Sequence, residues 1–251
     1  MFDYELKIAQ DKKEIQGALR LRYEVFRREM MGGLKNYDSE GLDEDAYDRV
    51  CDHLIVIDKE TSKIIGTYRI LQGCRREKGL GFYSEKFFDI RNIKKAAAGF
   101  EVLELGRSCI HKDYRNRSII NLLWTGIAKY IKDNNVRFLF GPVRLQGNDP
   151  QEISKTFKFM QERFYSGDEL RVYPWEKNKL TGLDYNVKVE EPRKIFNRLP
   201  PLVKGYVRLG ILVCGEPALN SDLNSVVVFA LLDIKNIPAA YRNHFIGDVY
   251  P

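Results

Sequence analysis

The segment 101–144 constrains the fold more than any other part of the sequence, because it predicts a strand, a basic loop, a helix and a second strand in direct succession. The run VLELGRSCI alternates apolar and polar residues as a half-buried strand does, and it ends at the polar run 111–117. Apolar residues then recur every three or four positions over 119–130, with Ser118 as the expected N-cap. Residues 137–141, RFLFG, open the next strand.

The loop and the strand before it carry charges that indicate a site. A helix N-terminus offers free backbone N–H groups, and Lys112, Arg115 and Arg117 add positive charge there, which favours a phosphate-bearing ligand. Glu104 and Arg107 interrupt an otherwise apolar strand, so we expect at least one of them to point into a cleft. The alternative is an ordinary crossover whose charges face solvent.

Composition places the chain among globular proteins. It has 251 residues, 44% of them hydrophobic and 12% aromatic, which is enough for a substantial core. No stretch reaches the roughly 20 apolar residues of a membrane span, and the N-terminus lacks the apolar region of a signal peptide, so we expect a cytoplasmic protein. The four cysteines form no CxxC pair and only three histidines occur, so neither a disulfide framework nor a metal site is expected.

The charge balance favours an acidic partner. Lys and Arg number 41 against 35 Asp and Glu, which gives a net charge of +6 and a pI near 9.0. The basic residues are dispersed among acids and no nucleic-acid-binding motif occurs, so we expect no nucleic acid partner. An acidic carrier protein fits this charge, and so does peripheral contact with an anionic membrane surface.

The order of elements predicts an α/β sandwich around a mixed, twisted sheet with helices on both faces. The expected strands are 6–10, 53–57 and 64–71 as a hairpin, 102–110, 137–140, 211–214 and 225–232. The expected helices are 11–31, a short one at 82–90, one from Ser118, one from Asp149-Pro150, and 199–208 ending at Gly210. We interpret 1–251 as one domain, with a largely polar insertion at about 147–198 before the last helix.

Several short motifs in this order resemble one branch of the GNAT acyltransferases. They are Arg22-Tyr23-Glu24-Val25-Phe26, Asp45-Ala46-Tyr47-Asp48, Gly66-Thr67-Tyr68-Arg69-Ile70-Leu71 and Glu104-Leu105-Gly106-Arg107-Ser108. The branch contains acyl-homoserine-lactone synthases, N-acyl amino acid synthases and ornithine-lipid acyltransferases. The tail, with LPPLVKGYVRLG, CGEPALN and YRNHF, resembles the last two groups. Signal synthases usually carry a tryptophan after the first helix, and this chain has none before Trp124.

The resemblance implies an enzyme that moves a 3-hydroxy fatty acyl group from acyl carrier protein to the α-amine of a free amino acid. Ornithine is the expected acceptor, which would give a lyso-ornithine lipid. Glycine or lysine is the alternative acceptor, and lactone synthesis comes after these. A different class of function, a basic GNAT-like module that binds RNA or a membrane without turnover, is the rival reading.

The resemblance also implies roles for the residues of the central strand. Glu104, directly or through one water, is the expected general base, with Arg107 beside it; a Glu104–Arg107 ion pair that only closes a polar cleft is the alternative. Backbone N–H groups from Ser108 to Ile110 are the expected donors to the oxyanion. Cys109 could instead be an acyl-accepting nucleophile, although a buried packing residue is the more common role of cysteine.

The substrate-binding residues follow from the same resemblance. Typical GNAT enzymes bind coenzyme A with a glycine-rich turn, whereas this turn reads Arg115-Asn116-Arg117-Ser118, so we expect a phosphopantetheine thioester on carrier protein rather than acyl-CoA, and no permanently bound cofactor. Lys112, Arg115, Arg117 and Ser118 would bind the donor. The expected acceptor-binding residues are Arg22, Phe26, Asp45, Asp48 and Arg69. Among them an arginine would bind the carboxylate and an aspartate a cationic side chain, while Phe26 could equally be a core residue.

Overall fold

A mixed sheet organises the fold. The computed structural model describes residues 3–30, 40–75, 80–147 and 149–241. Of Arg117 it describes the backbone but not the side chain. The strand order of the sheet is β1-β2-β3-β5-β6-β10-β8, with β9 also paired to β10. The strands are β1 (Tyr4–Ile8), β2 (Asp52–Asp58), β3 (Lys63–Gln72), β5 (Glu101–Ile110), β6 (Val136–Arg144), β8 (Leu212–Val213), β9 (Ala218–Asn220) and β10 (Ser225–Asp233). A separate small sheet pairs β4 (Phe88–Asp89) with β7 (Tyr173–Pro174).

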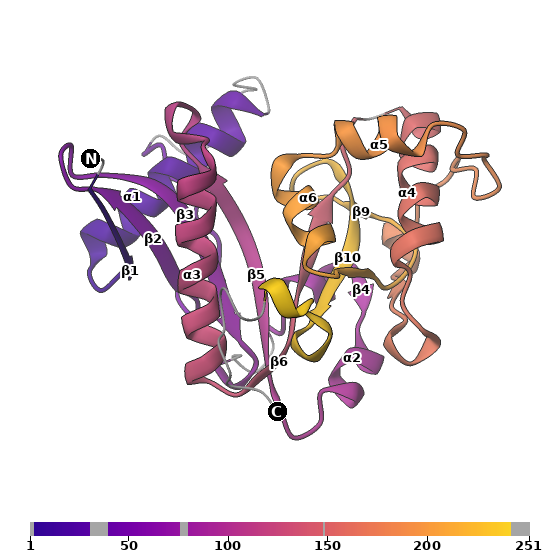
Figure 1. Ribbon diagram of the computed structural model, residues 1–251, viewed down its shortest axis with the longest axis horizontal. Helices are drawn as coiled ribbons and strands as arrows, with labels where there is room; N and C mark the ends of the chain where they lie inside the picture. Colours follow the sequence, from indigo (N-terminus) through magenta and orange to yellow (C-terminus); the bar gives the residue numbers. More distant parts are fainter. Residues whose placement is uncertain (1–2, 31–39, 76–79, 148, 242–251) are drawn as a thin grey trace.

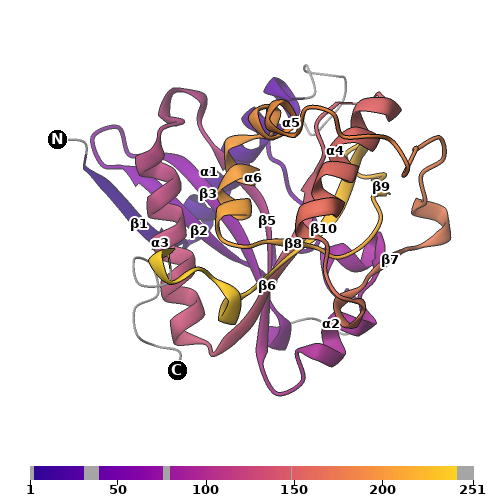
Figure 2. The ribbon, with the colours of Figure 1, turned by 45° about the vertical axis from the view of Figure 1, so that its right-hand side comes forward.

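Helices cover both faces of the sheet, as predicted (Figure 1). They are α1 (Lys12–Arg22), α2 (Arg91–Ala96), α3 (Arg117–Asp133), α4 (Pro150–Phe164), α5 (Pro192–Arg198) and α6 (Pro201–Arg208). Helix α3 packs its apolar stripe on Leu54, Val56 and Tyr68, whereas α1 lies against the opposite face. Figure 2 shows α6 between α3 and α4, above the divergence of the two central strands.

The hairpin and the strand–helix–strand unit are confirmed, and two local expectations were wrong. Asn116, not Ser118, is the N-cap of α3: its side chain accepts hydrogen bonds from the N–H groups of Ser118 and Ile119, and Asn caps a helix as well as Ser does. The segment 82–90 is a single 3₁₀ turn, Tyr83–Lys86, followed by β4. Burial of Phe87 and Phe88 in the core fixes an extended exit from the turn that a longer helix would not allow.

The first helix differs from a regular α-helix where it approaches the site. Asp11 caps α1, and the chain continues after Arg22 as a π-helix, Tyr23–Glu29. A π-helix shifts the face on which side chains emerge, and such turns are frequent at functional sites. The expected end of this helix at Met30-Met31-Gly32-Gly33 lies largely outside the described residues.

The region 147–198 holds the expected helix from Pro150 and, after it, the few short elements expected of this insertion. Asp149 caps α4, and α5 and β7 follow within the same region. Its apolar residues form a core with β6, β8 and β10, through Phe157, Phe159 and Met160. This part is therefore packed on the sheet, not a separate irregular loop.

Strands β5 and β6 separate after a short parallel ladder. They pair from Glu101 with Val136 to Glu104 with Phe140, and beyond this point β5 stays with β3 whereas β6 stays with β10 (Figure 1). The two backbones are in close approach at the branch point, because a Cβ on Gly141 would lie 2.2 Å from the carbonyl oxygen of Leu105. Only glycine fits there without displacement of the backbone.

A β-bulge in β5 sets which side chains face the same way. Thr67 pairs with Cys109 and Arg69 with Gly106, so β5 contains one more residue than β3 over this interval. Arg107, within the bulge, has a φ of 48°. Strict alternation would place Glu104 and Arg107 on opposite faces of the sheet. The extra residue brings both to the face that α1 covers.

We predict that Gly141→Ala lowers the free energy of unfolding by about 1–3 kcal/mol, since the added methyl group must displace the Leu105 carbonyl. Gly205→Ala is the matched control: a Cβ there meets no atom within 4 Å and the site is inside α6, so this change should stabilise by up to about 1 kcal/mol. Urea unfolding measures both. Equal effects of the two substitutions would contradict the close approach.

Candidate active site

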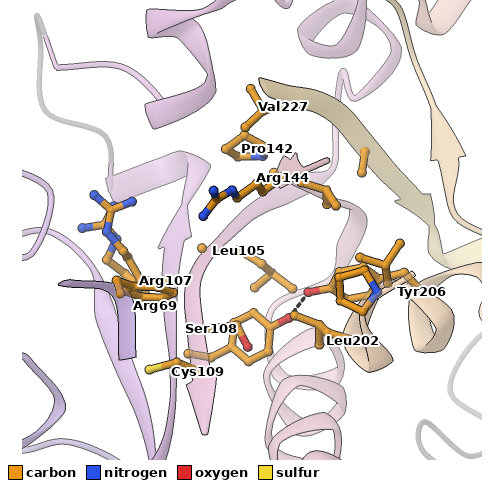
Figure 3. A pocket seen from close by; sticks show the side chains of 18 of the residues that line it. Arg69, Leu105, Arg107, Ser108, Cys109, Pro142, Arg144, Leu202, Tyr206 and Val227 are labelled. Carbon is orange, nitrogen blue, oxygen red and sulfur yellow. Dashed lines mark hydrogen bonds between the residues drawn. The ribbon is translucent and has the colours of Figure 1, made fainter. Parts of the chain in front are cut away.

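A cavity of about 550 Å³ opens where β5 and β6 separate. Residues of both sheet faces line it, among them Tyr83 and Phe140 from one core cluster and Tyr68 and Trp124 from another. The gap between the strands thus connects two compartments. The polar compartment is lined by Arg69, Glu104 and Arg107, and the apolar compartment, under α6, by Tyr68, Trp124 and Leu202. Figure 3 shows this cavity from close by.

Glu104 is a buried carboxylate that accepts three hydrogen bonds from the 3₁₀ turn Tyr83–Lys86. It accepts hydrogen bonds from the N–H of Tyr83 at 2.6 Å, from the N–H of Ser84 at 2.7 Å and from the Ser84 hydroxyl at 2.6 Å. Burial raises the pKa of Glu104, and the hydrogen bonds from Ser84 and Tyr83 oppose this rise. The expected alternative, an ion pair with Arg107, does not occur, because Arg107 pairs with Asp43 and Asp45 instead.

The arginines of this compartment form a network with three aspartates. Arg22 binds Asp48 at 2.6 Å and Asp43 at 2.9 Å, Arg69 binds Asp45 at 2.6 Å and Asp48 at 3.0 Å, and Arg107 binds Asp43 and Asp45 at 3.1 Å each. These contacts join α1, β3 and β5 to the segment 43–48 before β2, which we call the acidic loop. Burial alone would raise the pKa of Asp48, but attraction to Arg22 and Arg69 outweighs it and lowers this pKa to about 2.

The network separates the expected acceptor-binding residues into two groups. Phe26 and Arg69 line the cavity, whereas Arg22, Asp45 and Asp48 lie behind its wall. Asp45 and Asp48 are fully engaged with arginines, so neither carboxylate is left over for a ligand ammonium. Asp43, which completes the network, was not singled out from the sequence because a run of carboxylates looks the same whether it is solvated or buried.

The residues after Glu104 on β5 all line the cavity, and they point to opposite faces. Ser108 lies beside Tyr68 on the apolar side, while Cys109 packs with Leu21 and Val25 of the first helix. Burial raises the pKa of Cys109 to about 12, so the thiol is protonated at neutral pH. From Leu105 to Ile110, β5 has no strand partner on its β6 side among the described residues, which leaves backbone groups facing the gap.

The apolar compartment ends at a pair of tyrosines. The hydroxyl of Tyr206 on α6 hydrogen-bonds that of Tyr68 on β3 (Figure 3), and Trp124 packs edge-on against Tyr206. Leu202, Leu139 and other aliphatic side chains complete the wall. A lining of this kind suits a hydrocarbon chain.

The basic start of α3 lies at one mouth of the cavity. Arg115 lines the cavity and binds Glu29 through both ends of its guanidinium, at 2.5 and 2.6 Å. Lys112 and Ser118 are exposed and do not line the cavity, and the side chain of Arg117 lies outside the description. Of the expected donor-binding cations, Lys112 is therefore exposed and Arg115 is already paired.

Among the described residues, no group of histidine, cysteine and acidic side chains could hold a metal ion. No helix in the same ranges has the length and apolar character needed to cross a membrane.

Comparison with known proteins points to acyl transfer. Residues 21–125 match the family model described as an acetyltransferase (GNAT) domain. The L-ornithine N(alpha)-acyltransferase of Brucella abortus (strain 2308) is 31% identical over 96% of this chain and 88% of that protein, and the one of Agrobacterium fabrum (strain C58) is 32% identical over 97% and 85%. FeeM, an N-acyl amino acid synthase from uncultured soil microbes, has the same fold, with a TM-score of 0.55, 11% identity, and coverage of 94% of this chain and 93% of its own.

We predict that the arginine–aspartate network makes the free energy of unfolding decrease at acidic pH. A pKa lowered from 3.8 to about 2 means that the unfolded chain takes up the Asp48 proton first, so the free energy of unfolding falls as the pH drops through this interval. Asp48→Asn should lose part of that slope and also unfold about 3–5 kcal/mol more easily at neutral pH, because Arg22 and Arg69 keep buried charges without it. Asp222→Asn, which removes an exposed partner of Lys86, is the control. An unchanged slope in Asp48→Asn would refute the assignment.

Proposed function

Because the chain belongs to the family of the L-ornithine N(alpha)-acyltransferases and is an acyltransferase, we propose that it moves a 3-hydroxy fatty acyl group from acyl carrier protein to the α-amine of ornithine. The whole chain, 1–251, acts as one acyltransferase domain in this proposal. The observation that carries it is the cavity, which brings a buried carboxylate and an apolar compartment together at the gap between β5 and β6.

The two compartments match the two ends of the reaction. The acyl chain occupies the apolar side, toward Tyr206, and the amino acid occupies the polar side, near Glu104 and Arg107. The amine nitrogen attacks the thioester carbonyl carbon, a C–N bond forms, the C–S bond breaks, and the carrier's thiol leaves with a proton. Holding both substrates at the gap makes this step effectively unimolecular.

Glu104 is the proposed general base. An α-ammonium must lose a proton before it attacks, and a carboxylate whose pKa burial has raised accepts that proton more readily than an ordinary one. The three hydrogen bonds from Tyr83 and Ser84 fix its position and leave room for one further partner, the amine or a bridging water. Arg107 lies beside the acceptor and keeps the acidic loop in place.

The oxyanion of the transition state needs donors that are fixed before the reaction. We propose backbone N–H groups of Ser108 to Ile110, on the side of β5 that faces the gap, for this role. Direct attack by the amine needs no acyl-enzyme, and a thiol with a pKa of about 12 is a poor nucleophile, so we assign packing to Cys109.

Acyl carrier protein is the proposed donor, in preference to acyl-CoA. The turn before α3 contains no glycine and is closed by the Asn116 cap, whereas a pyrophosphate needs a turn that backbone N–H groups can surround. The exposed Lys112 suits the acidic surface of a carrier protein and its single phosphate.

Product analysis with purified protein tests the proposed function. Acyl carrier protein loaded with a 3-hydroxy fatty acid and ornithine, lysine or glycine should give N-acyl ornithine as the main product by mass spectrometry. Acyl-CoA in the same assay should react more slowly. Preference for glycine or lysine would overturn the acceptor, and no product with any amino acid would overturn the reaction.

We predict that Glu104→Gln lowers kcat by roughly tenfold or more at neutral pH, as loss of a general base does. The wild-type rate should rise with pH as Glu104 loses its proton, and this limb should vanish in Glu104→Gln. Ser84→Ala removes one donor to the carboxylate, so it should move the limb to higher pH while the base remains. A limb that stays in place in both variants belongs to another group.

We predict that charge reversal at Lys112 weakens use of acyl carrier protein. Lys112→Glu should raise the KM for the carrier at low salt and have a smaller effect at high salt, because screening already weakens the wild-type attraction there. Lys132→Glu makes the same change of charge at the other end of α3 and should leave this KM unchanged. Equal effects of the two reversals would count against a local docking site.

A further inference from the structure

The cavity contains a cation that the arginine–aspartate network does not use. Four arginines line the cavity, and three of them pair with carboxylates. Arg69 and Arg107 bind aspartates of the acidic loop, and Arg115 binds Glu29. The fourth, the half-buried Arg144 on β6, has no acidic partner within the described residues. Figure 3 shows its guanidinium pointing toward the side of the cavity where Arg69 and Arg107 lie.

The position of Arg144 along β6 places it with the polar compartment. Side chains alternate along a strand, so Arg144 shares a face with Phe138 and Phe140, and its direct partner on β10 is Val227. These three apolar residues belong to the cluster that includes Tyr83, whose N–H binds Glu104. Arg144 and the Glu104 turn therefore lie on the same face of the sheet, whereas α3 packs on the other face.

A second polar group on this face also lacks a partner. Ser225, two residues before Val227 on β10, lines the same cavity and is only 3% exposed. Its hydroxyl is buried without a hydrogen bond to any described residue. Buried polar groups normally have partners, and a turn of the Ser225 side chain about its Cα–Cβ bond would let a ligand atom in the cavity supply the missing one.

We propose that Arg144 and Ser225 bind the α-carboxylate of the amino acid acceptor. The inference rests on the proposed function, and it replaces the role that the sequence suggested for Arg22 or Arg69. Arg22 is fully buried behind the wall, and Arg69 already neutralises Asp45 and Asp48. A guanidinium fork matches the two oxygens of a carboxylate, and a hydroxyl can donate the third hydrogen bond. Held in this way, the acceptor keeps its α-amine on the face that carries Glu104.

The test compares ornithine with 1,4-diaminobutane, which has the same chain and terminal amines but no carboxylate. Arg144→Gln should raise the KM for ornithine about 10- to 100-fold and leave the weak use of 1,4-diaminobutane unchanged, so the preference between the two should collapse. Arg144→Lys should have an intermediate effect, because it keeps the charge and loses the fork. Ser225→Ala should raise the same KM by a smaller factor.

The controls separate binding from charge and from folding. Arg208→Gln removes an equal charge from an exposed site on α6 that does not line the cavity, and it should leave both acceptors unchanged. Thermal unfolding identifies any variant that fails to fold, in which case Arg144→Lys and Ser225→Ala decide the question.

Two results would overturn the inference while the proposed function stands. One is that the Arg144 variants acylate ornithine as well as the wild type does and keep its preference for ornithine over 1,4-diaminobutane. The other is a rise in the KM for the acyl donor instead of the acceptor, which would assign Arg144 to the donor's phosphate. A wild type that acylates no amino acid would overturn the proposed function, and the inference with it.

Discussion

The separation of β5 from β6 is the constraint on which the rest of the site depends. A parallel ladder that ended later would fill the gap with strand hydrogen bonds, and the cavity would not exist. Because the ladder ends at Glu104, the last paired residue of β5 is also the carboxylate that we propose as the base. Gly141 allows the two backbones to touch at the branch point before they diverge. The same local geometry thus creates the opening and places the proposed base beside it.

Ion pairing inside the wall determines which charged groups of the cavity remain for a ligand. Four arginines, with Arg27 as the fourth, face three aspartates in the network, which fixes the acidic loop without leaving a carboxylate for a ligand. A buried network of this kind is costly to break and contributes rigidity more than affinity. Arg144, which has no acidic partner among the residues that the structure describes, then stands out as the group available to an anionic ligand, and the raised pKa of Glu104 fits a site that must accept a proton.

The sequence predicted the regular elements well and the irregular ones poorly. Alternation and helical spacing identified the strand–helix–strand unit at 101–144, the hairpin and the helix from Pro150, because these patterns report burial directly. The β-bulge at Arg107 and the orphaned hydroxyl of Ser225 left no such pattern, since both depend on contacts between distant strands. Glu104 could be singled out from the sequence because a charged residue inside an apolar strand is unusual. Arg144 could not, because a charged residue at the end of a strand is common.

The structure of the protein with N-acyl ornithine bound would test the central claim most directly. Our account predicts that the amide of the product lies in the gap beyond Glu104 and Phe140, with its nitrogen facing the Glu104 carboxylate and its acyl chain running toward Tyr206. A product whose amide lies outside this gap, or whose acyl chain occupies the polar compartment, would contradict the account.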